Sequence, residues 1–236
     1  MNSDKSHNNP DWFNQRLNDG GPVYSETELG NLIVEPWNAI SSLLIVLPAL
    51  YWLFRIKSEF RNYKFLLFAI PLMILGGSGS TLFHAFRVSR FFLFMDVLPT
   101  AVLTLSLSIY FWIKVLKKWW YVFFIIIPVF FIRFLFFGNL PDHTAINVSY
   151  IITGIITGLP LIILLYKTRF YKFKYVLYTI LLFILAILFR ELDAREISFL
   201  PMGTHFLWHV FSGIGAYYIL AYLYWFRFRE LKSVDS

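Results

Sequence analysis

Residues 64–84 read KFLLFAIPLMILGGSGSTLFH, an apolar run that ends in small residues and a histidine. About 20 such residues cross the hydrocarbon core of a bilayer as an α-helix, because a helix satisfies its own backbone hydrogen bonds where lipid offers none. Six further segments have a similar length and hydropathy. The seven predicted spans are 37–56, 64–84, 92–113, 119–137, 145–166, 173–192 and 203–226. We therefore expect an all-α polytopic membrane protein, a bundle of seven transmembrane helices.

The composition supports this fold class and excludes several kinds of function. Of 236 residues, 58% are hydrophobic and only 15% are charged, whereas soluble domains carry about 25% charged residues. The net charge of +7 lies in short segments between the spans, which indicates membrane topology and headgroup contact rather than nucleic-acid binding. The chain has no cysteine, so a disulfide framework, a cysteine-ligated metal and a thiol nucleophile are excluded.

Short connections predict one membrane domain over residues 35–228, with a polar N-terminal tail at 1–34 and a cytoplasmic tail at 229–236. Residues 1–21 are polar and predict no cleavable signal peptide. The basic clusters orient the bundle, because lysine and arginine are enriched in cytoplasmic loops. They follow spans one, three, five and seven, which predicts an outer N-terminus and an inner C-terminus. A minority of arginines falls on the outer side: Arg87, Arg90, Arg190 and Arg195.

Three histidines fall within or at the ends of the spans, where ionisable groups are costly and are functional candidates. The predicted topology places His84 at the outer end of span two, and His205 and His209 in the first turns of span seven. Residues four apart share a helix face. Three imidazoles with a fourth position open to water are the ligand set of a catalytic zinc ion. We therefore predict zinc (Zn2+) bound by His84, His205 and His209.

Two further polar residues share this predicted depth. Asp96 lies near the outer start of span three, and Ser80 precedes His84 by one helical turn. Zinc lowers the pKa of bound water to about 7 and so supplies hydroxide. Asp96 is suited to accept a proton or to orient a ligand histidine, and Ser80 to donate to a developing oxyanion. Together these catalytic candidates suffice to hydrolyse an amide or ester.

Each of these residues also has a purely structural interpretation. Histidines can join helices through hydrogen bonds, and Ser80 ends a small-residue run, 76–80, that permits close helix packing. Asp96 is an alternative helix cap. The acidic Glu191 and Asp193 can pair with Arg190 or contact a lipid headgroup.

Several strings resemble alkaline ceramidases, which belong to a superfamily of seven-span membrane hydrolases with the adiponectin receptors and the Per1-type lipid remodelling proteins. The strings are Ser80-x-x-x-His84, MDVLP at 95–99 and GTHFLWH at 203–209. The stretches EPWNAIS at 35–41 and YSE at 24–26 resemble the pattern of bacterial members. The similarity covers roughly residues 22–226.

The resemblance implies zinc on the three histidines, Ser80 and Asp96 in the catalytic shell, and sphingolipid chemistry: hydrolysis of ceramide to sphingosine and a fatty acid. In the animal enzymes, acidic residues near the first helix also hold calcium (Ca2+). The matching positions here are Glu26, Glu35 and Asn38, which could instead cap the first span. Val23-Tyr24 stands where the animal pattern has Asp-Trp.

The leading hypothesis is a zinc-dependent intramembrane amide hydrolase in which a zinc-bound hydroxide cleaves ceramide or a related N-acyl lipid to a free amine and a fatty acid. The alternatives are a seven-span lipid receptor with structural zinc, or an ester or phospholipid hydrolase with the same site. The short loops and bacterial-like strings favour a bacterial inner membrane with the site toward the periplasm. A eukaryotic internal membrane is the alternative.

Overall fold

The computed structural model describes residues 12–195 and 200–233, and these contain seven α-helices. Each of the seven spans is long and apolar enough to cross a membrane, the fourth together with a short 3-10 turn, η2 (Trp119–Val122). The predicted all-α, seven-span class is therefore confirmed. The helices are α1 (Pro36–Ile56), α2 (Lys64–Phe86), α3 (Arg90–Leu116), α4 (Phe123–Asn139), α5 (Asp142–Lys167), α6 (Phe173–Asp193) and α7 (His205–Lys232).

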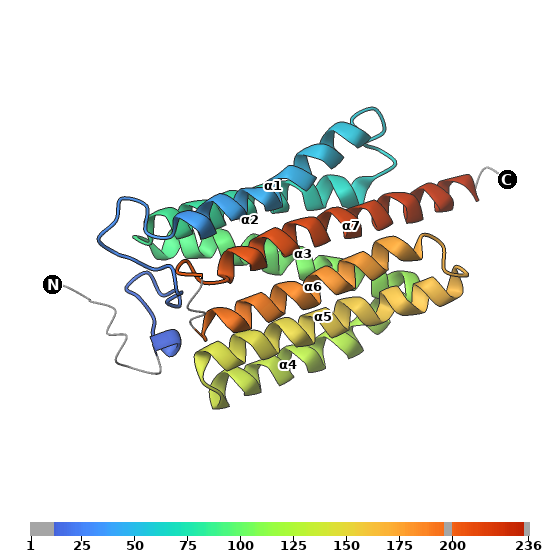
Figure 1. The fold of residues 1–236 in the computed structure, drawn as a ribbon. Coiled ribbons are helices and arrows are strands. Elements are labelled where there is room, and N and C mark those ends of the chain that lie inside the picture. Colours follow the sequence, from blue (N-terminus) through green and yellow to red (C-terminus); the bar gives the residue numbers. More distant parts are fainter. Residues whose placement is uncertain (1–11, 196–199, 234–236) are drawn as a thin grey trace. The chain divides into compact units, whose positions relative to one another are not determined.

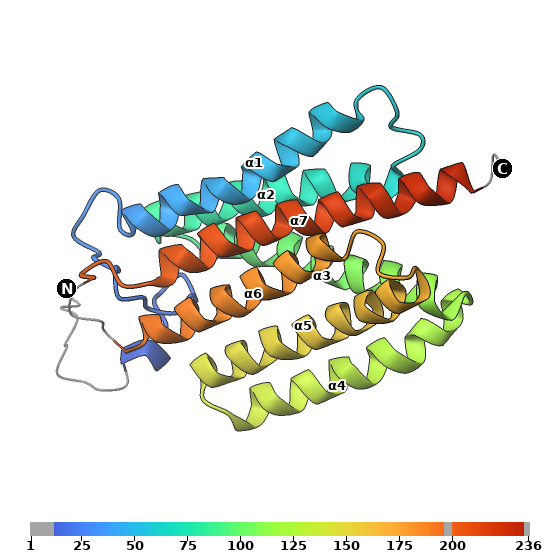
Figure 2. The ribbon, with the colours of Figure 1, turned by 45° about the vertical axis from the view of Figure 1, so that its right-hand side comes forward.

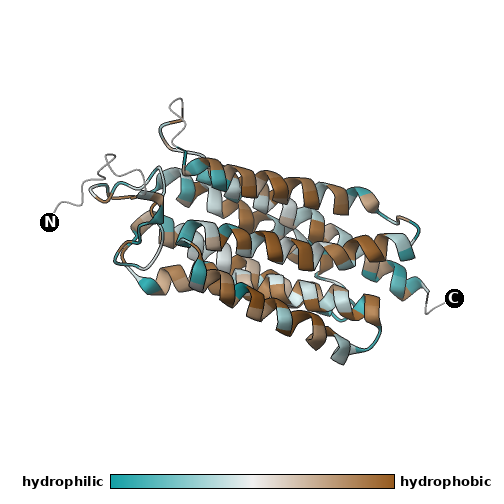
Figure 3. Ribbon diagram, turned by 90° about the horizontal axis from the view of Figure 1, so that it is seen from below, coloured by the Kyte–Doolittle hydropathy of each residue, from teal (hydrophilic) through white to brown (hydrophobic). Residues whose placement is uncertain are grey.

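The helix ends differ from the predicted spans by a few residues. Figure 3 shows hydrophobic residues along the middle of the helices, and hydrophilic residues at their ends and in the connections. The largest difference is at α7, which continues to Lys232 and so includes half of the segment expected as a tail at 229–236. Residues 1–11 of the expected N-terminal tail and residues 234–236 lie outside the described residues.

The chain divides into two compact units, which we describe separately. Unit 1 comprises residues 1–100 and 174–236, and unit 2 comprises residues 101–173. In unit 1, α1, α2 and α7 lie side by side (Figures 1 and 2). The first turns of α3 pack against α2, and α6 packs against α7 through Phe189 and Phe211, whose rings stack at 5.3 Å.

Glycines set two of the closest helix contacts in unit 1. A Cβ on Gly79 would lie 2.5 Å from the carbonyl group of Met95 on α3, and one on Gly213 would lie 2.7 Å from the carbonyl oxygen of Leu44 on α1. Only residues without a side chain allow such approaches. The run 76–80 is therefore a packing element as well as the segment that leads to Ser80 and His84.

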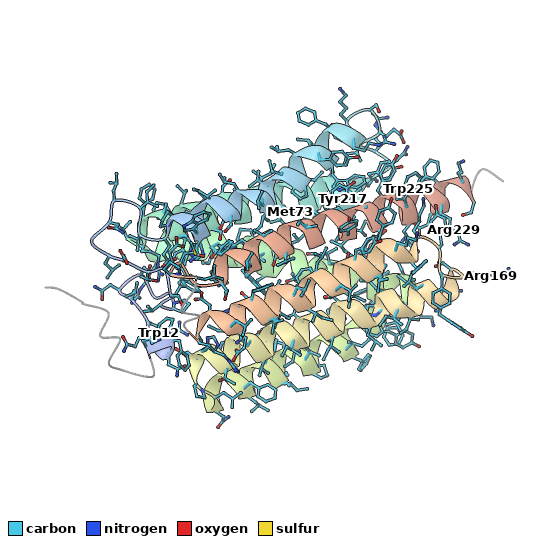
Figure 4. The ribbon with its side chains drawn as sticks, in the orientation of Figure 1. Trp12, Met73, Arg169, Tyr217, Trp225 and Arg229 are labelled. Atoms are coloured by element: carbon cyan, nitrogen blue, oxygen red, sulfur yellow. The ribbon has the colours of Figure 1, made fainter. Side chains whose placement is uncertain are left out.

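Aromatic side chains fill the opposite end of unit 1, where α1 and α7 end and α2 begins. The rings of Tyr63 and Tyr224 stack at 4.7 Å, and Trp52 packs on Tyr224 at 5.3 Å. Figure 4 shows Tyr217, Trp225 and Arg229 following one another along α7 toward this end. This aromatic layer holds α1, α2 and α7 together far from the histidines.

Unit 2 contains α4, α5 and the remainder of α3. The helices α4 and α5 lie side by side (Figures 1 and 2). Polar contacts join α3 to α5: the indole N–H of Trp112 donates to the carbonyl oxygen of Ile156 at 3.0 Å, and the hydroxyls of Ser108 and Thr157 form a hydrogen bond. The surface of unit 2 is rich in exposed phenylalanine.

Candidate metal centre

The three histidines predicted as metal ligands meet at one end of unit 1. His84 lies in the last turn of α2, and His205 and His209 lie in the first two turns of α7. Their ring centroids are 4.9–5.4 Å apart, and one ring nitrogen from each lies within 4.8 Å of the other two. All three side chains are buried. The fold therefore brings together residues that are more than 120 positions apart in the sequence.

The hydrogen-bonding state of these rings distinguishes them from ordinary buried histidines. Both ring nitrogens of His209 and the Nδ1 atom of His205 are buried and have no hydrogen-bond partner among the described residues. Buried polar atoms are almost always paired, because leaving one unpaired costs about 1–3 kcal/mol. For His209 in particular, the geometry therefore does not support the interpretation as a hydrogen-bonded packing residue. A shared metal ion would take one nitrogen from each ring, and so would satisfy one of the two unpaired nitrogens of His209.

The donor set fits a tetrahedral metal ion. Zinc–nitrogen bonds of about 2.0–2.1 Å place tetrahedral ligand atoms roughly 3.3 Å apart, and the three nitrogens lie within 4.8 Å of one another. Ligation therefore requires the rings to close by no more than about 1.5 Å. Three imidazoles leave a fourth position for water or substrate. The nitrogen donors suit several transition metals as well as zinc.

Glu35 orients the first ligand. Its Oε2 atom accepts a hydrogen bond from the Nδ1 atom of His84, and the Glu35 side chain is completely buried. Burial acts to raise the pKa of the Glu35 carboxyl, but the neighbouring His84 and the Arg87 guanidinium outweigh it, so this pKa lies below its usual value. An ionised carboxylate only accepts, which fixes the proton on Nδ1 and leaves Nε2 for a metal. Carboxylate–histidine pairs of this kind orient ligands in metal sites.

Ser80 and Asp96 lie together beside the triad. The Asp96 carboxyl group interacts with the Ser80 hydroxyl and, electrostatically, with His84. The close approach of α2 and α3 at Gly79 produces this pairing. Asp96 lies nearly two turns inside α3, which begins at Arg90, so its interpretation as a helix cap is wrong. The Ser42 hydroxyl on α1 lies 3.0 Å from the Ser80 hydroxyl and also donates to the Asn38 carbonyl oxygen.

Asp193 holds the start of α7 in place. Its Oδ1 atom accepts from the backbone N–H groups of Thr204 and His205 at 2.7 and 3.0 Å, and its Oδ2 atom accepts from the N–H of Ser25. Helix N-termini have unpaired N–H groups that such an acceptor satisfies. Asp193 is therefore a cap that α6 supplies to the start of α7. The neighbouring Glu191 lies 3.9 Å from Arg195 on the surface.

The N-terminal loop, residues 15–35 between η1 (Trp12–Asn14) and α1, covers the triad. Tyr24 stacks on His205 with ring centroids 4.0 Å apart and also contacts His84 at 5.3 Å. Burial raises the pKa of the Tyr24 phenol above its usual value, so the hydroxyl stays protonated at neutral pH. The loop is fastened to α6 by Ser25, whose hydroxyl donates to the Asp193 carbonyl oxygen at 2.6 Å.

The residues suggested for calcium have other partners. Glu26 caps α1, because its two carboxylate oxygens accept from the backbone N–H groups of Trp37 and Asn38 at 2.6 and 2.9 Å. Burial raises the pKa of Glu26. Glu35 accepts from Thr27, His84 and Arg87. In this group only the Oδ1 atom of Asn38 is a buried acceptor without a partner in the described chain.

Sequence reasoning predicted the triad, Ser80 and Asp96 as site residues, and the structure brings them together. It did not predict that Tyr24, Ser42, Arg87 and Asp193 lie around them. Tyr24 lies in a loop of no regular pattern, and Ser42 is one of many small residues in spans. Two signals were present for the others. Arg87 lies on the side of the predicted topology that carries few cations, and Asp193 precedes the second histidine segment.

No model of a known protein family matches the chain, and no curated protein matches it. The fold and the site therefore define a class: a seven-span, all-α membrane protein with three buried histidines that can hold a metal ion.

Proposed function

We propose that the protein is a zinc-dependent intramembrane amide hydrolase that cleaves ceramide or a related N-acyl lipid to a free amine and a fatty acid. The observation that carries this proposal is the triad itself: buried imidazoles converge on one point, and the nitrogens of His209 have no other partner in the described chain. The adjacent Ser80–Asp96 pair supports a reactive site rather than a purely structural one.

His84, His205 and His209 would hold the zinc ion, which when bound supplies a Lewis acid and lowers the pKa of water toward about 7. The chain's own groups then have separate tasks. The Asp96 carboxylate takes up the proton that the attacking water loses and later delivers it to the departing amine. The Ser80 hydroxyl donates to the amide oxygen as negative charge develops on it. Water adds across the C–N bond, so the acyl group leaves as the fatty acid.

The membrane setting supports a lipid substrate. The triad lies in helices that can cross a bilayer, so an amide whose acyl chain lies among the helices can reach it without leaving the membrane. The motifs shared with alkaline ceramidases favour ceramide within this class. Calcium stays a prediction, which only the Asn38 amide oxygen favours. We also propose a bacterial inner membrane, because the loops are short and the EPWNAIS string resembles bacterial members. The basic clusters follow spans one, three, five and seven, which favours the periplasmic side for the triad.

The experiment is a comparison of Asp96→Asn with the wild type, both purified in detergent and incubated with labelled N-acyl and O-acyl lipids. Removing a general acid–base group typically lowers the rate by 10²–10⁴-fold, so Asp96→Asn should release fatty acid at least about 100-fold more slowly while keeping its zinc. Asp142→Asn, at the start of α5 in unit 2, is the matched control and should retain the wild-type rate.

Three results separate the alternatives. Cleavage of O-acyl lipids alone would assign an esterase or phospholipase instead. Stoichiometric zinc without hydrolysis of any lipid tested would favour the receptor with structural zinc. Equal rates for Asp96→Asn and the wild type would remove Asp96 from the mechanism.

A further inference from the structure

Arg87 is a completely buried cation next to the triad. It follows the last residue of α2 and adopts a left-handed backbone conformation with φ 51°, which turns the chain sharply after His84. Its guanidinium lies over the Phe83 ring at 4.4 Å. A buried charge is costly unless it is paired and hydrogen-bonded. The partners of Arg87 therefore indicate the role of this residue.

Those partners come from the N-terminal loop. The Nε and one terminal nitrogen donate to the two carboxylate oxygens of Asp19 at 2.7 and 3.2 Å, a bidentate contact. The same terminal nitrogen donates to the Pro22 carbonyl oxygen at 2.9 Å, and the other donates to Glu35. Arginine's planar fork suits such a multiple contact. The guanidinium thus joins two carboxylates that are 16 positions apart.

The contact continues to the metal ligand. Glu35 binds Arg87 through Oε1 and His84 through Oε2. The backbone reinforces this link, because the Glu35 N–H donates to the His84 carbonyl oxygen at 3.1 Å and the Val34 N–H donates to Ala85 at 2.9 Å. One buried chain of charge-assisted hydrogen bonds therefore runs through Asp19, Arg87, Glu35 and His84. It ends at the imidazole ring of His84, the proposed metal ligand.

This arrangement fits poorly with a calcium ion at the same acidic residues. Calcium takes six to eight oxygen ligands, whereas the four carboxylate oxygens of Glu26 and Glu35 all accept hydrogen bonds from the protein. A divalent cation on Glu35 would also lie close to the positive guanidinium of Arg87. The guanidinium of Arg87 already occupies the position of a cation beside Glu35.

We propose that Arg87 is the resident cation of the N-terminal loop and a positioning residue for the metal centre: it holds Glu35 against His84, without help from a divalent ion. The inference rests on the proposed zinc site. It predicts that the loop and the ligand are coupled, so that a change at Arg87 alters the coordination of a metal that Arg87 does not touch.

The test measures metal binding rather than hydrolysis. Wild type, Arg87→Gln and Arg87→Lys are purified as full chains, and their zinc affinities are measured by chelator competition. Cobalt(II) is then substituted, and its visible absorption reports ligand geometry. Loss of an outer-shell partner typically lowers metal affinity 10–100-fold, so Arg87→Gln should lose about this much and shift the cobalt spectrum. Arg87→Lys keeps the charge but not the fork, and should lose less.

Arg90→Gln is the matched control. Arg90 lies three residues after Arg87 and is exposed, and its substitution by glutamine removes the same charge. Its zinc affinity and cobalt spectrum should equal those of the wild type. If Arg87→Gln also equals the wild type, the inference is overturned. If the wild type itself binds no zinc, the proposed function fails instead, so the two failures are distinguishable. A tenfold or greater rise in wild-type zinc affinity on adding calcium would also overturn the inference.

Arg87→Gln removes a buried charge and could prevent folding. A second variant covers that case: Arg87→Ala is purified with methylguanidinium, which can occupy the vacated space. Zinc affinity should rise with methylguanidinium concentration in Arg87→Ala and stay constant in Arg90→Gln. An affinity in Arg87→Ala that ignores methylguanidinium would contradict the role of the cation.

Discussion

At the scale of single residues, His209 is the most diagnostic member of the triad, because neither of its ring nitrogens has a partner in the described chain. Changing it to alanine removes an unsatisfied group and one metal ligand. Outer-shell changes cost 10–100-fold in metal affinity, so His209→Ala should weaken zinc binding by more than about 100-fold. Chelator competition measures the zinc affinity, and elemental analysis gives the zinc content of the purified protein.

The control for His209→Ala is His143→Ala on α5 of unit 2. His143 contacts Asn147 at 3.0 Å and belongs to no metal-binding group among the described residues. It should retain one zinc per chain. Unchanged zinc in both variants would show that the triad does not hold the metal.

The residues of this site were predictable to different degrees. The grouping of His84, His205, His209, Ser80 and Asp96 was predictable, because polar groups are rare in apolar spans and their depths coincide. Tyr24 could not be identified, since its stacking on His205 depends on how an irregular loop folds over the helix ends. The hydrogen bond between Glu35 and His84 likewise depends on a contact across 49 positions.

At the scale of elements, the contact of α2 with α3 sets the distance between Ser80 and Asp96. Gly79→Ala would place a methyl group 2.5 Å from the Met95 carbonyl group, which forces the helices apart. Overpacking typically costs about 1–3 kcal/mol, so Gly79→Ala should lower the melting temperature in detergent and reduce activity.

Gly158→Ala on α5 is the comparison for Gly79→Ala, because a Cβ there meets nothing within 4 Å. Alanine is favoured over glycine inside helices by about 1 kcal/mol, so this variant should be as stable as the wild type or more stable. Equal melting temperatures for the two variants would mean that α2 can yield at Gly79 without cost.

The start of α7 depends on another element, α6. Asp193→Ala leaves the N–H groups of Thr204 and His205 without their acceptor. Loss of a cap costs about 0.5–2 kcal/mol, and the freed first turn should also weaken zinc binding through His205. Thermal unfolding with and without zinc measures both effects. Glu191→Ala, which removes the surface pair with Arg195 at 3.9 Å, should change neither.

The elements themselves were well predicted from hydropathy, because seven long apolar runs admit few other structures in a membrane. Their ends were less certain. The extension of α7 to Lys232 was missed, since Arg227 and Arg229 look like the start of a solvated tail. In the structure Arg227 pairs with Glu230 at 3.1 Å, one turn further along the same helix, which favours continuation.

At the scale of the whole molecule, the basic clusters predict which side of the membrane the triad faces. The positive-inside rule assigns the loop between α1 and α2 to the cytoplasm, and therefore the loop before α1 to the outer side. The chain has no cysteine, so single cysteines report topology without a background. Asn31→Cys and Ser58→Cys place a thiol at an exposed position in each loop.

In intact cells, a membrane-impermeant maleimide should label Asn31→Cys and leave Ser58→Cys unlabelled until the membrane is opened. The reverse pattern would place the triad on the cytoplasmic side, and the substrate would then have to come from the inner leaflet. This result would leave the metal site intact, because the contacts that build it lie within unit 1 and do not depend on orientation. For the proposed hydrolase, orientation would decide only which leaflet supplies the N-acyl lipid, and therefore on which side the fatty acid and the amine would be released.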